Sequence, residues 1–364
     1  MKRPVIGVLT WRNGKRFAEP AYFRRLIREG EKLGATVFLF APHDVAPSEK
    51  RVRGFVPDGS GNWRERWFAP PDAVFDRYRY TPTQAFRHYV AFRRKSRFLY
   101  VNNRLANKWR VHQVLAADEG MRRWLPETVL YKPGSLVQML HRHPLIYLKP
   151  INGTGGRNIL RIEKTAGGYR MLGRDKQRAT ITAAVSGIAA VQRFAARWAK
   201  GDKYVVQQGL RLQLIPNRAV DMRLLIQKDG SGEWKVTGHA MRVGGQKSAT
   251  SNLHGGGKAV PALTFLSPRF GTERTEQIVQ ECEQLAQQTA RTLENHFGRM
   301  AEFGLDIGID LNGRAWLIEV NPKPGREVFR RMGMLKLYRQ AISRPLEYAL
   351  HLAERHREKR LASG

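Results

Sequence analysis

Three oxygen-bearing side chains near the end of the chain have the types and spacing to bind a metal ion. Asp306 lies in one apolar segment, and Glu319 and Asn321 close the next one. The Asn312-Gly313 pair between these segments is typical of a hairpin turn, and a two-residue turn there brings Asp306 opposite Glu319. Glu319 and Asn321 are two residues apart, so they project from the same face of a strand. Mg²⁺ prefers such oxygen ligands and completes its shell with water and substrate phosphates.

The alternative for these residues is an exposed hairpin whose carboxylates are only solvated. The sequence around Glu319 is apolar, however, and buried charges are normally paired or bound to metals because an unpaired one is strongly destabilising. A metal site at Glu319 and Asn321 is therefore the favoured interpretation. Asp310, just before the turn, is instead expected to organise the turn.

A glycine-rich segment between two expected strands could bind phosphate. It begins at Lys149-Pro150 and continues through Gly153, Thr154, Gly155 and Gly156. Glycines let backbone N–H groups approach phosphate oxygens, and a lysine can neutralise phosphate charge. The segment is not a Walker A loop, because no Gly-Lys-Ser/Thr follows, and it leads into a strand rather than into the helix of a dinucleotide-binding loop. Taken alone, it is better explained as a plain turn.

Two further groups of residues are weaker candidates. One expected strand ends in Gln207, Gln208 and Leu210, and such a strand end can offer backbone groups to an adenine edge. Arg223 and Arg242 lie at the ends of other expected strands, and the planar donor fork of arginine suits phosphate. In a chain so rich in arginine, a surface role is the simpler explanation for either one taken alone.

The elements that must position these residues follow an α/β pattern. At the front, strands at 5–9 and 36–40 flank a helix at 18–33, which is a βαβ unit. Residues 81–97 are expected to form a basic helix. Later elements are expected as strands at 145–149, 158–163, 168–172, 204–206, 222–227 and 234–243, helices near 184–199 and 272–297, and the hairpin at 305–320.

The composition indicates a folded protein of two or three packed units. The chain has 364 residues, of which 42% are hydrophobic. Its one cysteine, Cys282, excludes an intrachain disulfide and a cysteine-based metal site. No apolar run approaches the roughly 20 residues of a membrane span, and the apolar stretch after the charged start is too short for a signal peptide. We therefore expect a cytoplasmic protein that does not bind membranes.

The charge of the chain is its most unusual bulk property. Lys and Arg number 64 against 31 Asp and Glu, a formal net charge of +33. Such a field attracts anionic molecules and polyanions in a salt-dependent way. Residues 87–98 interleave aromatic and basic side chains, as single-strand nucleic-acid binders do. As a helix, however, this segment presents a basic face over an apolar one, so nucleic acid is disfavoured as a partner.

Taken in order, the motifs resemble the ATP-grasp superfamily, and more closely its spore-coat-associated YheC/YheD-type branch. The resemblance covers roughly residues 100–345 and rests on Asn107-Lys108-Trp109, Leu125–Thr128, Lys149-Pro150 with Gly153–Gly156, Val206–Gly209, Asp221-Met222-Arg223, Ser251-Asn252-Leu253, and Asp306 with Glu319-Val320-Asn321. It implies an α/β (α+β) fold, with two ATP-grasp lobes after a small α/β domain. The expected boundaries are 1–100 for that domain, 101–209 and 210–350 for the smaller and larger lobes, and 351–364 for a basic tail.

The resemblance also implies ATP and Mg²⁺ as cofactors and gives each candidate residue a role. Phosphate contacts from the smaller lobe would come from Lys108 and Lys149, beneath a lid formed by Gly153, Thr154, Gly155 and Gly156. The adenine and ribose pocket would be lined by Gln207, Gln208 and Leu210, and one or two Mg²⁺ ions would be held by Asp306, Glu319 and Asn321. The transferring phosphate would be stabilised by Arg223 and Arg242, with Asn252 nearby. The hinge differs from many superfamily members, which have an acidic residue towards the ribose where this chain has Gln207-Gln208.

ATP-grasp enzymes are generally ligases, so the resemblance implies an activity. A carboxylate attacks the γ-phosphate to give an acylphosphate and ADP, and an amine then displaces phosphate. The substrates would be small-molecule or peptide carboxylates and amines, and the net charge of +33 favours an acidic acceptor. The alternative is a spore-coat-associated nucleotide-binding or structural protein without turnover. The retained trio of Asp306, Glu319 and Asn321 argues against that alternative.

Overall fold

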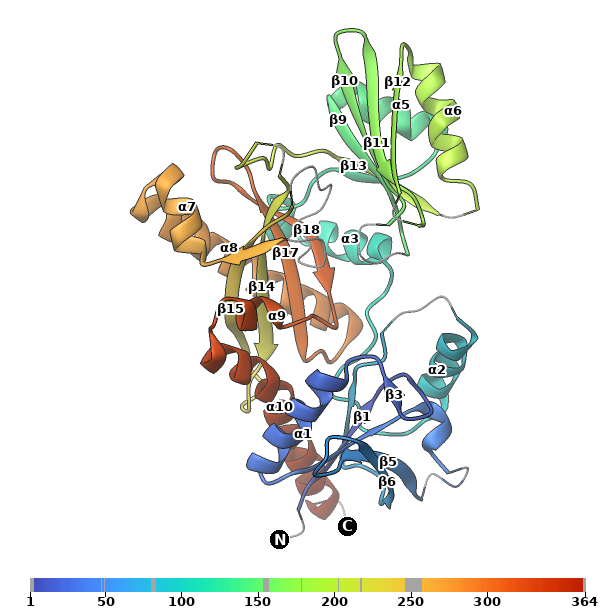
Figure 1. Ribbon diagram of the computed structural model, residues 1–364, viewed down its shortest axis with the longest axis vertical. Coiled ribbons are helices and arrows are strands. Elements are labelled where there is room, and N and C mark those ends of the chain that lie inside the picture. Colours follow the sequence, from blue (N-terminus) through green and yellow to red (C-terminus); the bar gives the residue numbers. More distant parts are fainter. Residues whose placement is uncertain are drawn as a thin grey trace.

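The computed structural model describes residues 3–46, 48, 50–79, 83–152, 157–177, 179–201, 203–216, 218–245 and 257–362. These residues form three α/β units, each built around its own sheet (Figure 1). The N-terminal unit and the larger lobe lie against each other, and the smaller lobe stands at the end of the molecule opposite to the two termini (Figure 1). None of the helices within the described ranges is long and apolar enough to cross a membrane.

The N-terminal unit contains the predicted βαβ segment. β1 (Val5–Leu9) is parallel to both β4 (Thr36–Phe40) and β7 (Ala73–Asp76), and α1 (Pro20–Lys32) connects β1 with β4. Both faces of these strands are covered by apolar side chains, which explains their nearly continuous apolar sequences. The remaining elements are β2 (Arg12–Asn13), β3 (Arg16–Phe17), the 3-10 helix η1 (Pro42–Asp44), β5 (Val52–Pro57), β6 (Trp63–Phe68) and α2 (Gln84–Lys95).

The smaller lobe is a six-stranded sheet with helices on one face. Its strand order is β12-β11-β10-β9-β13-β8. Because side chains alternate along a strand, Ile146 and Leu148 of β9 pack into the core beneath the helices, while Tyr147 and Lys149 lie on the opposite face and line a cleft. Its elements are β8 (Thr128–Leu130), α5 (Pro133–Arg142), β9 (Leu145–Pro150), β10 (Ile159–Thr165), β11 (Gly168–Arg174), β12 (Thr180–Val185), α6 (Ile188–Trp198) and β13 (Tyr204–Gln208).

The larger lobe is an antiparallel sheet with strand order β16-β15-β14-β17-β18. One face packs against the long helix α8 through a core that includes Met222, Leu224 and Leu305. The other face is divided between the cleft and the contact with the N-terminal unit. Its elements are α3 (Lys108–Ala117), α4 (Glu119–Arg122), β14 (Val220–Lys228), β15 (Trp234–Val243), β16 (Lys258–Val260), α7 (Ala262–Phe270), α8 (Thr272–Phe297), β17 (Glu302–Ile309), β18 (Ala315–Asn321) and α9 (Glu327–Arg331).

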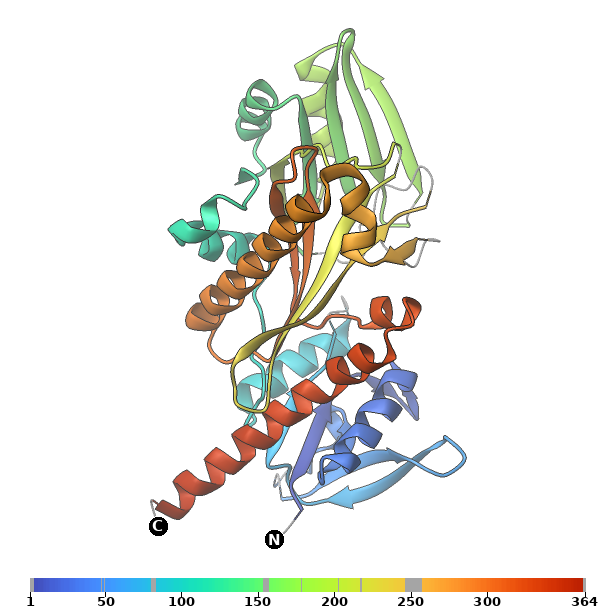
Figure 2. The same cartoon turned by 90° about the vertical axis from the view of Figure 1, so that its left-hand side faces the viewer.

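The last helix joins two of the three units. α10 (Leu335–Ala362) runs from the larger lobe along the N-terminal unit and ends beside it (Figure 2). Its buried residues share a core with α1, including Ile342 and Leu346. The helix therefore includes residues 351–362 of the segment that the sequence analysis sets apart as a basic tail.

The hairpin of β17 and β18 has the predicted register, although its turn differs from the prediction. The backbone N–H of Asp310 bonds the carbonyl of Arg314 at 3.0 Å, so three residues rather than two form the loop, and Gly313 has a positive φ of 78°. A bulge next to Asp306 shifts the pairing back by one residue, so Asp306 still faces Glu319. The predicted role of Asp310 is confirmed, because its Oδ1 accepts hydrogen bonds from the backbone of Asn312 and Arg314 at 2.9 and 3.0 Å.

A buried polar network fixes the N-terminal unit against the larger lobe. Arg77, which follows β7, is fully buried and pairs with Glu19 at 2.9 Å and with Glu302 of β17 at 3.0 Å. Glu302 also pairs with Arg326 and accepts a hydrogen bond of 2.9 Å from Gln227. Burial alone would lower the pKa of Arg77, but the nearby carboxylates Glu19 and Glu302 raise it. The arginine therefore stays charged inside this interface.

Replacing Glu302 by glutamine should destabilise the protein strongly. The substitution keeps the shape of the side chain but leaves two buried arginines short of a carboxylate, and breaking a buried pair in this way typically costs about 3–5 kcal/mol. The free energy of unfolding from urea denaturation measures the effect. Glu65→Gln on the exposed face of β6 is the control, with an expected change within about 0.5 kcal/mol. Equal stability of Glu302→Gln and wild type would contradict the role of this network.

Candidate functional site

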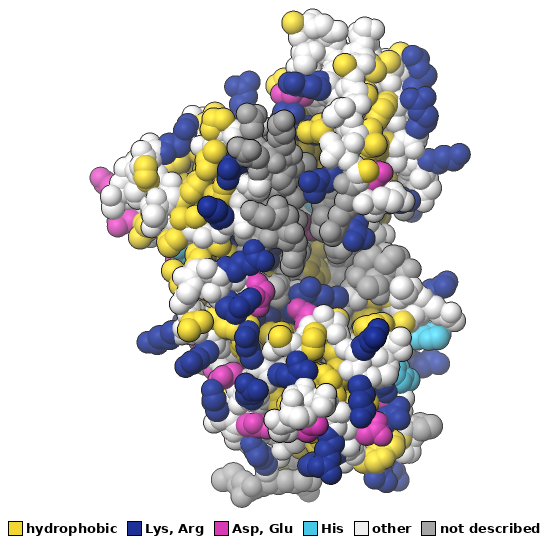
Figure 3. Space-filling view, viewed as in Figure 1, with side chains coloured by type: hydrophobic (Ala, Val, Ile, Leu, Met, Phe, Trp, Pro, Cys, Tyr) yellow, Lys and Arg dark blue, Asp and Glu magenta, His cyan; other side chains and the backbone are white. Residues whose placement is uncertain are grey.

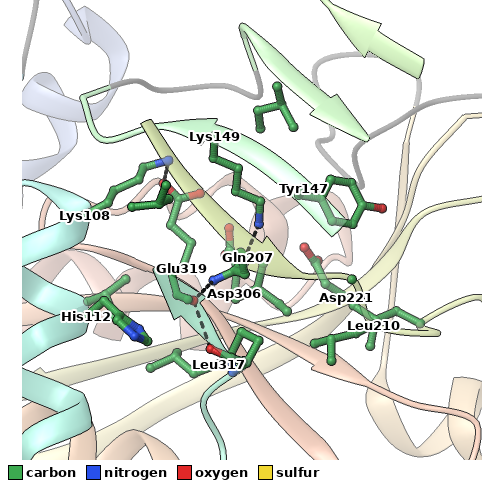
Figure 4. A pocket seen from close by; sticks show the side chains of 18 of the residues that line it. Lys108, His112, Tyr147, Lys149, Gln207, Leu210, Asp221, Asp306, Leu317 and Glu319 are labelled. Atoms are coloured by element: carbon green, nitrogen blue, oxygen red, sulfur yellow. Dashed lines mark hydrogen bonds and ion pairs between the residues drawn. The ribbon is translucent and has the colours of Figure 1, made fainter. Parts of the chain in front are cut away.

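A large cleft between the two lobes collects most of the candidate residues. Its volume is about 1510 Å³. The candidates that line it come from both lobes and from the connection between them: Lys108, Lys149, Gln207, Gln208, Leu210, Arg223, Arg242, Asp306, Glu319 and Asn321. Figure 4 shows Lys108, Lys149 and Gln207 near Asp306 and Glu319. The remaining candidates, Gly153, Thr154, Gly155, Gly156 and Asn252, lie outside the described residues.

The carboxylate of Asp306 is nearly buried yet remains ionised. Burial would raise its pKa, but Arg223 and Arg242 lower it below the usual value. Arg223 Nη2 lies 2.7 Å from Asp306 Oδ1, and Arg242 Nη2 lies 3.1 Å from Oδ2. The two arginines therefore keep a negatively charged oxygen donor at the floor of the cleft.

Glu319 and Asn321 complete the set of oxygen donors. Glu319 faces Asp306 across the hairpin, and Asn321 ends the same strand opposite Gly304. The described residues contain no cluster of three or more His, Cys, Asp or Glu that could hold a metal. Two carboxylates and one amide do not form a closed protein cage. They suit Mg²⁺, which commonly takes one or two carboxylates and leaves its other positions to water and substrate phosphates.

Two lysines lie close to this donor set, Lys108 at the start of α3 and Lys149 on β9 of the smaller lobe. Lys108 is the first residue of α3, and its Nζ lies 2.9 Å from Glu319 Oε1 (Figure 4). The side chain of Asn107 caps the helix by accepting a hydrogen bond of 3.0 Å from the backbone of Arg110. Lys149 projects from β9, and burial, followed by repulsion from Lys108, lowers its pKa to about 8 despite attraction by Glu319. Both lysines are placed to meet an anion above the carboxylates.

A side chain of the hinge strand β13 holds the ammonium group of Lys149. Gln207 Oε1 accepts a hydrogen bond of 2.5 Å from Lys149 Nζ, and Gln207 Nε2 donates one of 2.9 Å to Thr128 Oγ1. Thr128 also lines the cleft, although the sequence analysis gave it no role. The neighbouring Gln208 accepts a hydrogen bond of 3.1 Å from the backbone of Glu127. In this conformation both hinge glutamines are bonded to the smaller lobe.

Close packing at the hinge explains the glycine that follows these residues. The backbone N–H of Gly209 bonds the carbonyl of Leu145 at 2.8 Å. A Cβ at this position would lie 2.2 Å from the side chain and 2.8 Å from the carbonyl oxygen of Leu145. Any other residue at this position would require Leu145 and its strand to shift.

Asp221 is a further charged residue of the cleft that the sequence analysis left without a role. It lies opposite Arg242 in the pairing of β14 with β15. Both of its carboxylate oxygens accept hydrogen bonds from Arg242, at 2.7 and 2.6 Å. The Asp221-Met222-Arg223 motif is visible in the sequence. The role of Asp221 is not, because its partner Arg242 lies 21 residues away on another strand.

Comparison with known proteins identifies the family of this chain. The model of the YheC/D-like ATP-grasp domain matches residues 97–352, which is more than half of the chain. The chain belongs to the YheC/D-like ATP-grasp family. It is 26% identical over 344 residues to the endospore coat-associated protein YheD of Bacillus subtilis, covering 92% of this chain and 74% of that protein. It is 28% identical over 328 residues to YheC of the same organism, also described as endospore coat-associated, covering 86% of this chain and 87% of that protein.

Solved structures confirm the predicted ATP-grasp fold of this YheC/D-like protein. D-cycloserine synthetase DcsG superposes with a TM-score of 0.58 at 14% identity, covering 96% of this chain and 99% of that one. The D-alanine-D-alanine ligase of Coxiella burnetii superposes with a TM-score of 0.54 at 13% identity, covering 99% of this chain and 98% of that one. At this level of identity the similarity concerns the fold and not the substrate.

We predict that binding of a nucleotide in this cleft depends on the protonation of Lys149. Its pKa of about 8 in the free protein should rise when a polyphosphate binds beside it. Affinity is then highest below pH 8 and falls as pH rises through 8 to 9.5. At pH 8, binding should take up roughly half a proton, since the lysine is then half protonated.

Isothermal titration of ADP in two buffers with different ionisation enthalpies measures this proton uptake. Lys149→Arg is the matched control, because arginine stays protonated throughout this pH range. Identical heats in both buffers for the wild type would contradict the assignment, as would the same proton uptake by Lys149→Arg.

Proposed function

We propose that this protein is an ATP- and Mg²⁺-dependent ligase that activates a carboxylate as an acylphosphate for attack by an amine. The observation that carries the proposal is the placement of Asp306, Glu319 and Asn321 opposite Lys108 and Lys149 in one cleft. Family membership and the ligase fold of the superposed structures support the same reaction class. The cleft is also large enough for a nucleotide together with a second substrate.

The chemistry requires two anions to approach each other, so the chief tasks of the protein are alignment and neutralisation of charge. Lys149 would bind the nucleotide phosphates from the smaller lobe, and Lys108 would bind them from the first turn of α3, which packs on the larger lobe. Arg223 and Arg242 would stabilise the transferring phosphate and the acylphosphate from the larger lobe. Mg²⁺ held by Asp306, Glu319 and Asn321 would offset negative charge on the phosphates. The adenine would lie beside the hinge, with Leu210 in its pocket.

The charge of the cleft supports an acidic acceptor for this reaction. Among the described residues, eleven Lys and Arg but only four Asp and Glu line the cleft. Each of the four acids is paired with an arginine or lysine. Mg²⁺·ATP carries about two negative charges and so leaves a positive excess. The outer surface of the molecule continues this pattern, with Lys and Arg spread over the face shown in Figure 3.

A second candidate function is a role in the spore coat without ligase turnover, exerted by a protein that is made in the cytoplasm. Both curated relatives are described as endospore coat-associated proteins. A structural role alone does not explain why the ionised carboxylate of Asp306 and a lysine of lowered pKa meet in one cleft. Ligase activity is therefore the preferred function, and association with the coat would describe the location of the enzyme rather than its activity.

Substrate-dependent release of ADP tests the ligase directly. Purified protein with Mg²⁺·ATP is assayed with a panel of amino acids and acidic peptides. Glu319→Gln should lower the stimulated rate by about 10²-fold or more, because the variant loses a group that stabilises charge in the transition state. Glu65→Gln, on the exposed face of β6, should keep the wild-type rate. A stimulated rate that survives in Glu319→Gln would contradict the site. ATP binding with no stimulation by any compound would favour the coat role.

Binding of an acidic acceptor should depend on Arg174 and Arg218 together. Both line the cleft, and neither pairs with a carboxylate within the described part of the chain. Arg174→Gln combined with Arg218→Gln should raise KM for an acidic peptide by about tenfold, as expected for the loss of charge-assisted contacts, and should leave KM for ATP nearly unchanged. The wild-type KM for that peptide should also rise with ionic strength. Equal effects on acidic and uncharged acceptors would contradict the preference.

A further inference from the structure

Four charged side chains alternate in sign across the floor of the cleft. Asp221 and Arg223 project from the same face of β14. Arg242 of β15 lies opposite Asp221, and Asp306 of β17 lies opposite Arg223. Ion pairs join them into one chain: Asp221 with Arg242, Arg242 with Asp306, and Asp306 with Arg223. The set is neutral overall, and only Asp306 among its members belongs to the proposed metal site.

Arg242 is held much more firmly by one of its carboxylate partners than by the other. Its Nε and Nη2 bond the two oxygens of Asp221 at 2.7 and 2.6 Å, a bidentate arrangement. Its contact with Asp306 is a single one of 3.1 Å. Asp221 is therefore the principal hydrogen-bond partner of Arg242, while the charge of Asp306 also raises the pKa of this arginine.

This difference matters because both a metal ion and the guanidinium groups of the neighbouring arginines can bind the oxygens of Asp306. A Mg²⁺ ion at the site would compete for them with the guanidinium groups of Arg223 and Arg242. If Asp221 were absent, Asp306 would be the carboxylate left beside Arg242 on this face of the sheet. Both arginines would then rely on the carboxylate that the metal needs.

We propose that Asp221 is a positioning residue that holds Arg242 back from Asp306. It thereby keeps Asp306 available to Mg²⁺ and keeps Arg242 beside the transferring phosphate. The inference rests on the proposed function, since it concerns the same nucleotide and metal. Asp221 itself is a poor metal ligand in this arrangement, because both of its oxygens already accept short hydrogen bonds from Arg242.

The metal dependence of nucleotide binding tests the proposal without relying on activity. The probe is a fluorescent ADP analogue at fixed concentration, titrated with MgCl₂ and separately measured in EDTA. For Asp221→Asn, the half-saturating Mg²⁺ concentration should rise about tenfold, the effect expected from one additional charged hydrogen bond competing for Asp306. Affinity in EDTA should be unchanged or higher, because the cleft has lost a negative charge. Damage to the fold would instead weaken binding under both conditions.

Arg242→Met gives a test of opposite sign and remains informative if Asp221→Asn does not fold. Removing the competing guanidinium should lower the half-saturating Mg²⁺ concentration severalfold, even though ligase turnover is lost with the arginine. An unchanged Mg²⁺ requirement in Asp221→Asn would overturn the proposal, as would equal weakening in EDTA or a higher requirement in Arg242→Met. If the wild type itself shows no Mg²⁺-dependent nucleotide binding, the proposed function fails first and this inference fails with it.

Discussion

A carboxylate that must remain ionised while almost buried is the constraint on which the site depends. Asp306 lies on β17, an inner strand of the sheet, where desolvation favours its neutral form, and two arginines reverse that preference. The need for these arginines explains the positions of Arg223 and Arg242 on the flanking strands. It also explains why β14, which is apolar on its other face, carries alternating charges on the cleft side.

The same face of the larger lobe serves two purposes along its length. Asp306 and Arg223 meet at the cleft, whereas four residues further along the paired strands Glu302 and Gln227 meet in the interface with the N-terminal unit. The sheet that holds the proposed metal ligands is thus anchored directly to that unit. The smaller lobe has a separate core and is bonded to the hinge through Gly209. We therefore expect the N-terminal unit and larger lobe to move together, and the smaller lobe to move against them.

Local sequence patterns predicted several of the elements, because each pattern depends on neighbours in the chain. The βαβ segment, the helix at 272–297 and the pairing of Asp306 with Glu319 were all readable in this way. The pairing was correct even though the loop has one residue more than predicted, since a bulge compensates for it. Asp310 was recognised as a turn residue for the same local reason.

Contacts between distant segments could not be read from the sequence. Asp221 and Arg242 are joined by strand pairing across 21 residues, and Arg77 reaches Glu302 across 225. The hydrogen bonds of Gln207 with Lys149 and Thr128 likewise form only because the strands β13, β9 and β8 are adjacent in the sheet. A charged residue such as Arg77 is normally assigned to the surface, and its complete burial follows only from the docking of two units.

A crystal structure of the protein with Mg²⁺ and ADP tests the central claim most directly. The account predicts the adenine beside Gln207–Leu210, the phosphates between Lys108 and Lys149, and Mg²⁺ coordinated by oxygens of Asp306, Glu319 and Asn321. A nucleotide bound elsewhere, or a metal that leaves these three side chains uncoordinated, would contradict it.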